Sequence, residues 1–179
     1  MARSSYDMFY PNYRYATRVS SIRDVDFENL TVFWRPGDKA DRGAKLRNGA
    51  FKNRYKNGYE GVNLDLLQFL DQRGDTAQRA IVDLAWQDCG GSCTYVGLVQ
   101  VFELRSGFPT VVQEIEYDRH APGTGVTFDP ESKILMVTGR SDDPSPNCCP
   151  KSVDVMRFEW DGQKFLLASS KSVAVEEKR

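Results

Sequence analysis

Short runs of alternating polar and apolar residues, separated by turn signals, dominate the second half of the chain. Residues 95–104 and 110–117 alternate in this way on either side of a Ser-Gly-Phe-Pro turn, and Asp161-Gly162 separates two further runs. A period of two residues is typical of β-strands, and Asp-Gly between two such runs is a strong hairpin signal. The pattern predicts a mainly β fold, an antiparallel meander that forms a sandwich or a curved sheet.

The first half of the chain is less regular. Residues 22–34 fit a strand with a small irregularity near Glu28-Asn29, and residues 64–70 fit either a short helix or a buried strand. Periodicity alone does not decide between helix and strand for such a short apolar run. An α+β fold with at most one or two short helices therefore stays open.

Length and composition are those of one globular domain. The chain has 179 residues, of which 40% are hydrophobic and 27% charged, and a chain of this size buries a sizeable core. We expect an aromatic-rich N-terminal extension over residues 1–20, a single β-rich domain over 21–172 and a solvated tail over 173–179.

The charge balance disfavours one class of partner. The 24 Lys and Arg residues offset 25 Asp and Glu residues to a net charge of −1, which argues against a general electrostatic grip on nucleic acid or anionic membrane. No run approaches the roughly 20 apolar residues that a membrane helix needs. We expect a monomer without a membrane span, whose partner is an unidentified protein or other component.

One stretch mixes basic and aromatic residues. Residues 39–59 are rich in both, and the candidate binding surface within them comprises Lys52, Arg54, Tyr55, Lys56 and Tyr59. Phosphate contacts combined with base stacking allow such a pattern to bind single-stranded nucleic acid. A solvated strand and loop is the favoured interpretation, because acidic residues flank the stretch and no RNA-binding signature occurs.

Four cysteines, Cys89, Cys93, Cys148 and Cys149, suggest covalent stapling. A bond between the adjacent Cys148 and Cys149 would form a strained ring, so we expect two cross-links between the 88–93 loop and the 147–150 loop, with the pairing open. Such bonds indicate an oxidising compartment. A zinc site and a redox motif are the alternatives, and the C-x3-C spacing with an adjacent pair is poor for both.

Enzyme chemistry is hard to assemble from these residues. The one histidine, His120, lies in a Gly-Pro-rich loop, and no nucleophile elbow or phosphate loop is present. Glu114 and Glu116 share a predicted strand face and are a candidate carboxylate pair for a hydrolase. Arg73 lies between the carboxylates of the Asp71–Asp75 turn and would repel a cation, which disfavours a calcium site there. We predict no catalytic residues, no metal and no cofactor.

A family resemblance rests mainly on the C-terminal part. Asn147-Cys148-Cys149-Pro150, a strand, and Phe158-Glu159-Trp160-Asp161-Gly162 resemble the LppP/LprE-type bacterial exported lipoproteins, as does the turn and strand beginning at Asp75. The likeness spans about residues 63–167, and the 71–75 turn lacks the fuller Asp-Gly pattern of the family. The resemblance implies export and a cell-envelope role, and it supplies no catalytic residues.

Together these observations predict a non-catalytic, secreted or periplasmic, cell-envelope-associated binding or structural module of unknown ligand. A leader peptide or lipidated segment removed on export would account for the absence of an apolar signal core after Met1. The alternatives are a cell-envelope hydrolase that uses carboxylates and a nucleic-acid-binding protein that uses residues 39–59.

Overall fold

The computed structural model describes residues 17–34, 42–70, 79–141 and 151–175. Within them lie two 3-10 helices, η3 (Ile22–Asp24) and η4 (Phe27–Asn29), and eleven strands. The strands are β1 (Thr31–Trp34), β2 (Arg42–Lys45), β3 (Ala50–Tyr55), β4 (Gly58–Leu70), β5 (Arg79–Cys89), β6 (Cys93–Arg105), β7 (Phe108–Asp118), β8 (Gly125–Asp129), β9 (Ile134–Arg140), β10 (Ser152–Trp160) and β11 (Phe165–Ala174). The predicted mainly β fold is confirmed.

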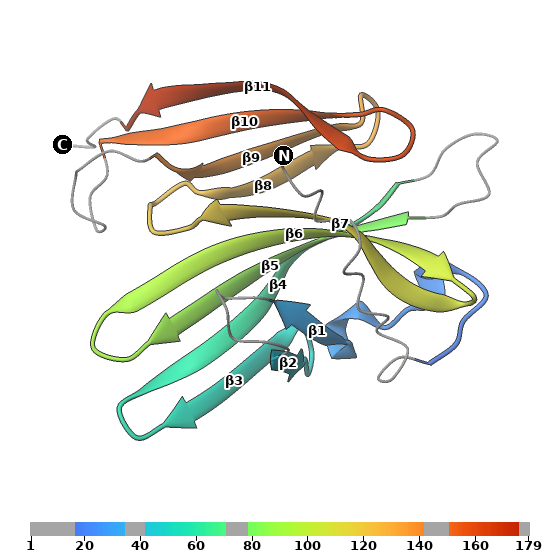
Figure 1. Ribbon diagram of the computed structural model, residues 1–179, viewed down its shortest axis with the longest axis horizontal. Helices are drawn as coiled ribbons and strands as arrows, with labels where there is room; N and C mark the ends of the chain where they lie inside the picture. Colours follow the sequence, from blue (N-terminus) through green and yellow to red (C-terminus); the bar gives the residue numbers. More distant parts are fainter. Residues whose placement is uncertain (1–16, 35–41, 71–78, 142–150, 176–179) are drawn as a thin grey trace, which may run out of the picture.

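All described strand pairs are antiparallel, and they form three sheets. A five-stranded sheet has the order β3-β4-β5-β6-β7, a four-stranded sheet the order β11-β10-β9-β8, and β1 pairs with β2. The two larger sheets face each other as a sandwich, and β1, β2 and the 3-10 helices lie on the other side of the five-stranded sheet (Figure 1). The order is a meander within each large sheet, as the alternating runs predict.

The central strands of the five-stranded sheet, β5 and β6, are buried on both faces. One core cluster joins Ile22, Phe27 and Val32 of the N-terminal layer to Phe102 of the sheet, and a second joins the sheet to Phe158 and other residues of the four-stranded sheet. A strand covered on both faces has apolar residues at consecutive positions rather than at alternate ones. The run from Ala80 to Leu84 in β5 follows this rule, with one buried exception at Asp83.

Both predicted hairpin turns contain residues of positive φ. Ser106 and Gly107 have φ of 54° and 84° between β6 and β7, and Gly162 has φ of 105° between β10 and β11. The Asp161 carboxylate accepts backbone N–H bonds from Gln163 and Lys164 at 2.7 and 2.8 Å, which stabilises the second turn. Both predicted hairpins are therefore confirmed.

The N-terminal strand prediction is wrong in part. Residues 22–24 and 27–29 form the two 3-10 helices instead. The side chains of Ser21 and Asp26 cap them by accepting from the backbone N–H groups of Arg23 and Asn29. Ser and Asp favour such caps over extended pairing. The apolar residues at 64–70 belong to strand β4, so the helical alternative for them is also wrong.

The predicted ends of the domain need one correction. Val173 and Ala174 pair with β10 as the last residues of β11, so the solvated tail predicted over 173–179 does not begin at 173. Within the predicted extension 1–20, the backbone N–H of Val19 donates to the carbonyl of Gly107 at 2.9 Å, and residues 1–16 lie outside the described residues.

Candidate functional site at the hairpin tips

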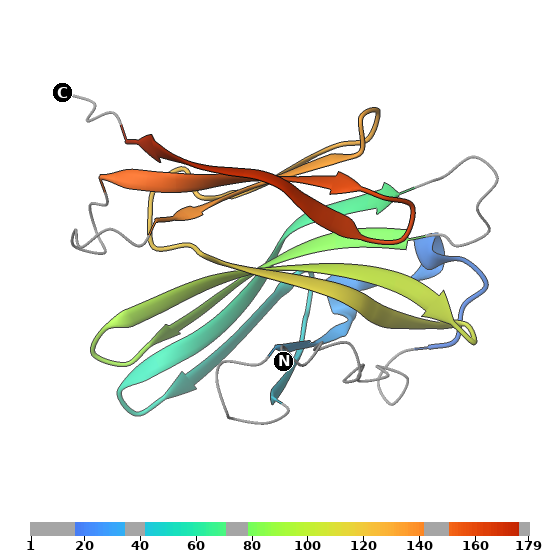
Figure 2. The ribbon, with the colours of Figure 1, turned by 45° about the horizontal axis from the view of Figure 1, so that its top comes forward.

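Two neighbouring hairpins of the five-stranded sheet project beyond the sandwich. The turn between β3 and β4 and the turn between β5 and β6 lie at the same end of the sheet and point away from the four-stranded sheet (Figures 1 and 2). Residues at the ends of a β-sandwich are free to vary without disturbing the core, so binding surfaces often lie there. We call this end of the five-stranded sheet, formed by residues 52–60 and 87–95, the hairpin tip.

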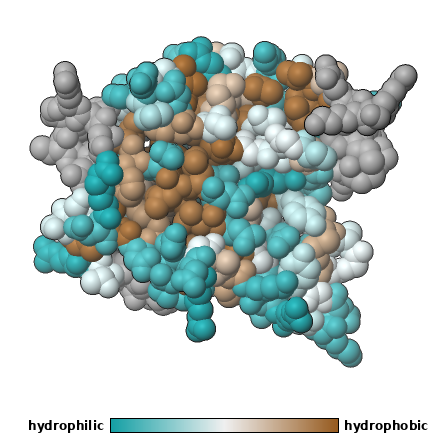
Figure 3. Space-filling view, turned by 180° about the vertical axis from the view of Figure 1, so that it is seen from behind, coloured by the Kyte–Doolittle hydropathy of each residue, from teal (hydrophilic) through white to brown (hydrophobic). Residues whose placement is uncertain are grey.

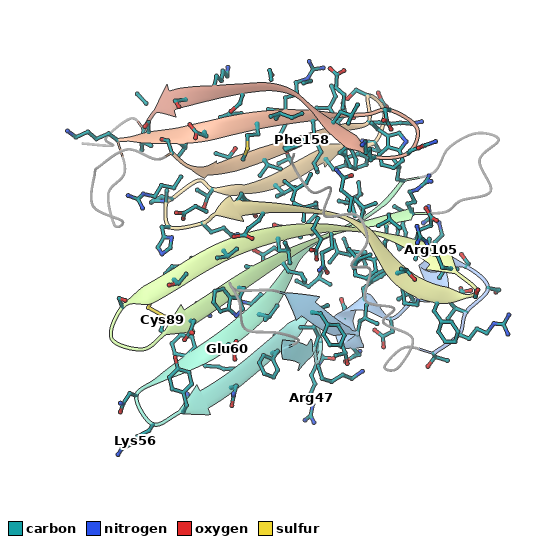
Figure 4. All side chains as sticks on the ribbon, in the orientation of Figure 1. Arg47, Lys56, Glu60, Cys89, Arg105 and Phe158 are labelled. Atoms are coloured by element: carbon teal, nitrogen blue, oxygen red, sulfur yellow. A yellow bond between two sulfur atoms is a disulfide. The ribbon has the colours of Figure 1, made fainter. Side chains whose placement is uncertain are left out.

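The structure places the predicted binding residues on the β3–β4 hairpin but divides them between its two faces. Lys52, Arg54 and Tyr59 share one face, because Arg54 pairs with Tyr59 across the hairpin and Lys52 is two residues from Arg54. Tyr55 lies on the opposite face, and Lys56 occupies the outermost turn (Figure 4). The five residues therefore do not form one continuous surface.

The aromatic rings of this hairpin already have polar partners. The Nζ atom of Lys52 lies 4.6 Å from the centre of the Tyr59 ring, and the Tyr59 hydroxyl donates to Gln87 at 3.4 Å. The Tyr55 hydroxyl donates to the Asp88 carboxylate, and this bond, with burial and the charge of Asp88, raises the pKa of Tyr55. Base stacking on Tyr59 would require Lys52 to move, which weakens the nucleic-acid alternative.

A groove runs between the two turns. Its volume is about 550 Å³, and its lining is rich in hydroxyl, amide and backbone groups: Tyr55, Lys56, Asn57, Asp88, Gly90, Ser92 and Thr94. The Tyr55 side chain is 43% exposed and closes one wall. Because the single ammonium and the single carboxylate offset each other, the groove has no net charge.

Gly90 allows the Tyr55 ring to lie across the neighbouring turn. A Cβ atom added at Gly90 would lie 3.2 Å from the Tyr55 hydroxyl and 3.7 Å from the ring. A larger residue at this position would push the ring out of the groove or break its hydrogen bond to Asp88. The small residues of the β5–β6 turn thus contribute to the shape of the groove as well as to the turn.

A disulfide fixes the second turn. Cys89 and Cys93 oppose each other at the ends of β5 and β6 with a Cα–Cα distance of 4.1 Å, and their sulfur atoms are bonded (Figure 4). The predicted cross-links from this loop to the 147–150 loop are therefore wrong. The two residues face each other directly across the hairpin, so their side chains are neighbours. Cys148 and Cys149 lie outside the described residues.

His120 connects the disulfide hairpin to the end of β7. Its Nδ1 atom lies 2.6 Å from an Asp118 carboxylate oxygen, and its Nε2 atom lies 3.3 Å from the Tyr95 amide nitrogen and 3.0 Å from the Cys93 carbonyl oxygen. Both ring nitrogens face protein partners, and the imidazole packs edge-on against the Tyr95 ring. This geometry makes His120 a structural link and leaves no ring nitrogen directed at a nucleophile.

Asp83, which sequence patterns did not single out, is a buried carboxylate whose pKa is raised. Its side chain is 2% exposed, and both carboxylate oxygens accept bonds from the Tyr117 hydroxyl, at 3.0 and 2.9 Å. Tyr117 reaches from β7 to β5 across Gly97 of β6. A Cβ atom at Gly97 would lie only 2.0 Å from the ring, so glycine is required there. The signal in the sequence is a lone Asp inside a continuous apolar strand.

Arg119 joins Asp83 to a second carboxylate. One guanidinium nitrogen lies 3.5 Å from Asp83 and 2.6 Å from Asp65 of β4. The pKa of Asp83 is raised to about 6, chiefly because burial removes the carboxylate from water. The Tyr117 hydrogen bond and the charge of Arg119 lower this pKa, and the charge of Asp65 raises it. Perturbed carboxylates often mark active sites, but Asp83 is enclosed and hydrogen-bonded. We interpret the cluster as a structural network that joins strands β4, β5 and β7 of the five-stranded sheet.

The predicted carboxylate pair lies on the opposite face of the five-stranded sheet. Glu114 and Glu116 share a face of β7, as expected, and both are exposed. Glu114 accepts a bond from the Gln100 side-chain amide at 2.7 Å, and that amide also donates to the Phe33 carbonyl at 3.0 Å. The partners of Glu114 thus link β7, β6 and β1, which is a structural arrangement.

No group of three or more His, Cys, Asp or Glu side chains suited to hold a metal ion occurs among residues 17–34, 42–70, 79–141 and 151–175. The Asp71–Asp75 turn lies outside those ranges. In the same described part of the chain, no helix has the length and apolar character needed to cross a membrane.

Comparisons with known proteins identify no relative. No family model matches the chain, and neither a curated protein nor a solved structure matches it. The resemblance to the LppP/LprE-type lipoproteins therefore stays a prediction from the residues that carry it.

Proposed function

We propose that this protein is a non-catalytic binding module of the cell envelope, secreted or periplasmic, and that the groove at the hairpin tip receives its ligand. The observation that carries the proposal is the combination of exposed Tyr55 with Asn57, Gly90, Ser92 and Thr94 on two adjacent turns. Tyrosine provides rigid amphipathic contact area at a low entropy cost, and Ser, Gly and Asn provide adaptable hydrogen bonds, which is the composition of loop-based binding sites.

The disulfide supports this proposal in two ways. It holds the Gly90-Gly91-Ser92 turn in one conformation, which lowers the entropy lost when a ligand binds. Disulfides persist mainly outside the cytosol, so the Cys89–Cys93 bond is also consistent with an extracytoplasmic location.

The groove chemistry favours a ligand rich in hydroxyl groups, such as a cell-envelope glycan. Asp88 has carboxylate oxygens that accept from hydroxyls, and Asn57 provides both a donor and an acceptor. The exposed face of Tyr55 offers an apolar surface for the carbon skeleton of a sugar ring. A strongly charged polymer is less well matched, since the lining carries one positive and one negative group.

A sedimentation assay with purified insoluble peptidoglycan, combined with a glycan array, tests the proposal. The wild-type protein is expected to bind a glycan probe, and Tyr55→Ala is expected to weaken binding at least about tenfold, the loss of one well-packed aromatic contact and a hydrogen bond. Thr127→Ala on β8, far from the tip, serves as the matched control and should bind like wild type. Absence of binding to every glycan, or equal binding by Tyr55→Ala, would contradict the proposal.

The extracytoplasmic location has a separate test. Non-reduced, alkylated protein isolated from its native source should yield a single peptide that contains both Cys89 and Cys93 in unalkylated, disulfide-bonded form, as the structure predicts. Free alkylated thiols at both positions would remove the support that the disulfide lends to export.

A further inference from the structure

Strand β11 is an edge strand that leaves much of its surface uncovered. Among the described strands it pairs with β10 alone, and it forms the last strand of the four-stranded sheet (Figure 1). From Leu166 to Ala174 every residue is exposed, and three large hydrophobic side chains lie here: Leu166 at 45%, Leu167 at 56% and Val173 at 39%. On the face seen from behind the view of Figure 1, a group of apolar residues lies among hydrophilic ones (Figure 3).

Exposed edges of this kind normally carry protection that β11 lacks. Proteins block edge strands with proline, with several charged residues or with a covering element. Residues 165–174 contain no proline and one charged residue, Lys171. Within the described part of the chain, the first residue is protected: the Gln113 amide donates to the Phe165 carbonyl at 2.8 Å and accepts from its N–H at 2.8 Å.

A β-bulge determines which backbone groups point outward. The Lys164 carbonyl accepts from the Asp161 N–H at 3.1 Å, and the Val175 N–H donates to the Lys151 carbonyl at 2.8 Å. Both residues therefore direct backbone groups toward the β10 side. In a regular strand only residues an even number of positions apart do so, and these two are eleven apart. The register shift opposite Arg157 and Phe158 leaves Ala168 as the extra residue and accounts for this change. The outward backbone groups therefore belong to Leu167 before the bulge and to residues 170, 172 and 174 after it.

We propose that β11 pairs with β11 of a second copy of this chain across a twofold axis, and that two four-stranded sheets join into one continuous sheet. In an antiparallel register with the axis between Ser169 and Ser170, Leu167 faces Ser172 of the second copy, and both residues have outward backbone groups. The two symmetry-related Leu167–Ser172 pairs provide the backbone bonds, since Ser170 faces Ser169, whose groups are directed at β10. The same register sets Leu166 opposite Val173. Both lie on the outer face, since their β10 partners are Glu159 and Val153.

The charges in this register also favour a second copy. Lys171 lies opposite Ala168 of the second copy rather than opposite another lysine. In the register shifted so that Ser170 faces Ser172, the two Lys171 residues would oppose each other, which is destabilising. The net charge of −1 adds little repulsion between two copies. The dimer is isologous and therefore closes without further growth.

The contact is one strand wide, so the dimer is expected to be weak, with a dissociation constant in the range of about 1–100 µM. Sedimentation equilibrium from about 5 to 500 µM protein measures it. Leu166→Lys should raise the dissociation constant at least about tenfold, because it removes apolar contact and adds two charges at the axis-related positions. Val173→Lys is the second variant, and Thr127→Lys on the other edge strand, β8, is the control.

Cross-linking tests the register. Under mild oxidation the double variant Leu166→Cys/Val173→Cys should form a covalent dimer, since its cysteines face each other at neighbouring non-hydrogen-bonded positions. Leu166→Cys/Lys171→Cys should not, because no cysteine opposes either position. A wild-type protein that stays monomeric to 500 µM overturns the proposal, as does a dimer that neither lysine variant weakens or equal cross-linking of both cysteine pairs. A dimer would also replace the monomer expected from sequence.

Discussion

Replacement of Asp83 by asparagine should remove one pH-dependent contribution to the free energy of unfolding. Its pKa is about 6 in the folded protein against 3.8 for an unperturbed aspartate, a difference of about 2 units. Because the pKa is raised on folding, the folded state holds this proton more tightly, so the stabilisation is full below pH 3.8 and is lost as the pH rises through about 6. At about 1.4 kcal/mol per unit, the loss amounts to about 3 kcal/mol.

Urea unfolding of wild type and Asp83→Asn between pH 4 and pH 7 measures this term. Asparagine keeps an acceptor for the Tyr117 hydroxyl but does not titrate, so its stability relative to wild type should rise by about 2–3 kcal/mol over that range. Other carboxylates titrate in both proteins, and the difference removes their contribution. Asp129→Asn is the control, since this exposed group has a lowered pKa through the Ser132 hydroxyl. Parallel pH profiles for wild type and Asp83→Asn would refute the reasoning.

Two further changes test the same end of the sheet. Gly97→Ala should lower the free energy of unfolding by about 2–4 kcal/mol, because its Cβ would displace the Tyr117 ring. Gly61→Ala is the matched control. Its Cβ would lie 3.0 Å from the flexible end of the Gln87 side chain, so this change should cost less than about 1 kcal/mol. Thermal unfolding followed by circular dichroism compares them, and equal melting temperatures would contradict the close approach. Cys89→Ser/Cys93→Ser should cost about 2 kcal/mol, the chain-entropy value for a loop this short, in urea unfolding. A loss above 4 kcal/mol would instead indicate a long cross-link.

Local patterns predicted most of the β structure. The β6–β7 and β10–β11 hairpins follow from alternating runs on either side of a turn signal, because both the strand period and the turn conformation depend on residues close in sequence. One further signal of the same kind was missed: Asn48-Gly49, with φ of 52° and 76°, forms a tight turn that pairs Arg47 with Ala50. Asn-Gly is among the strongest hairpin signals, so this turn was predictable.

Irregularities within strands were harder to predict. Bulges shift the register of β4, β7 and β11. After each bulge, the residues whose side chains would have pointed to one face of the sheet point to the other. A bulge depends on the fit between two strands and on the twist of the sheet, so no single-residue signal marks it. The third layer, in which Ile22 and Phe27 cover the five-stranded sheet, likewise depends on packing between segments far apart in sequence.

The sequence and the structure direct attention to the same hairpin. The alternating basic and aromatic residues of 52–59 placed the predicted binding surface on β3–β4, and this hairpin also lines the proposed groove. Their division between two faces, and the contribution of the β5–β6 turn through Asp88 and Ser92, required the pairing of β4 with β5. A groove formed by two turns more than thirty residues apart leaves no pattern within either of them.

By itself, the sequence determined the elements of this protein: antiparallel strands, their turns and the cysteines that can be oxidised. Strand period, turn conformation and thiol chemistry are properties of neighbouring residues. Only the tertiary structure decided that Cys89 pairs with Cys93, that Gly97 makes room for Tyr117 to reach Asp83, and that β11 is left at an open edge. Each of these depends on which strands become neighbours, and strand order is set by the burial of apolar faces across the whole chain.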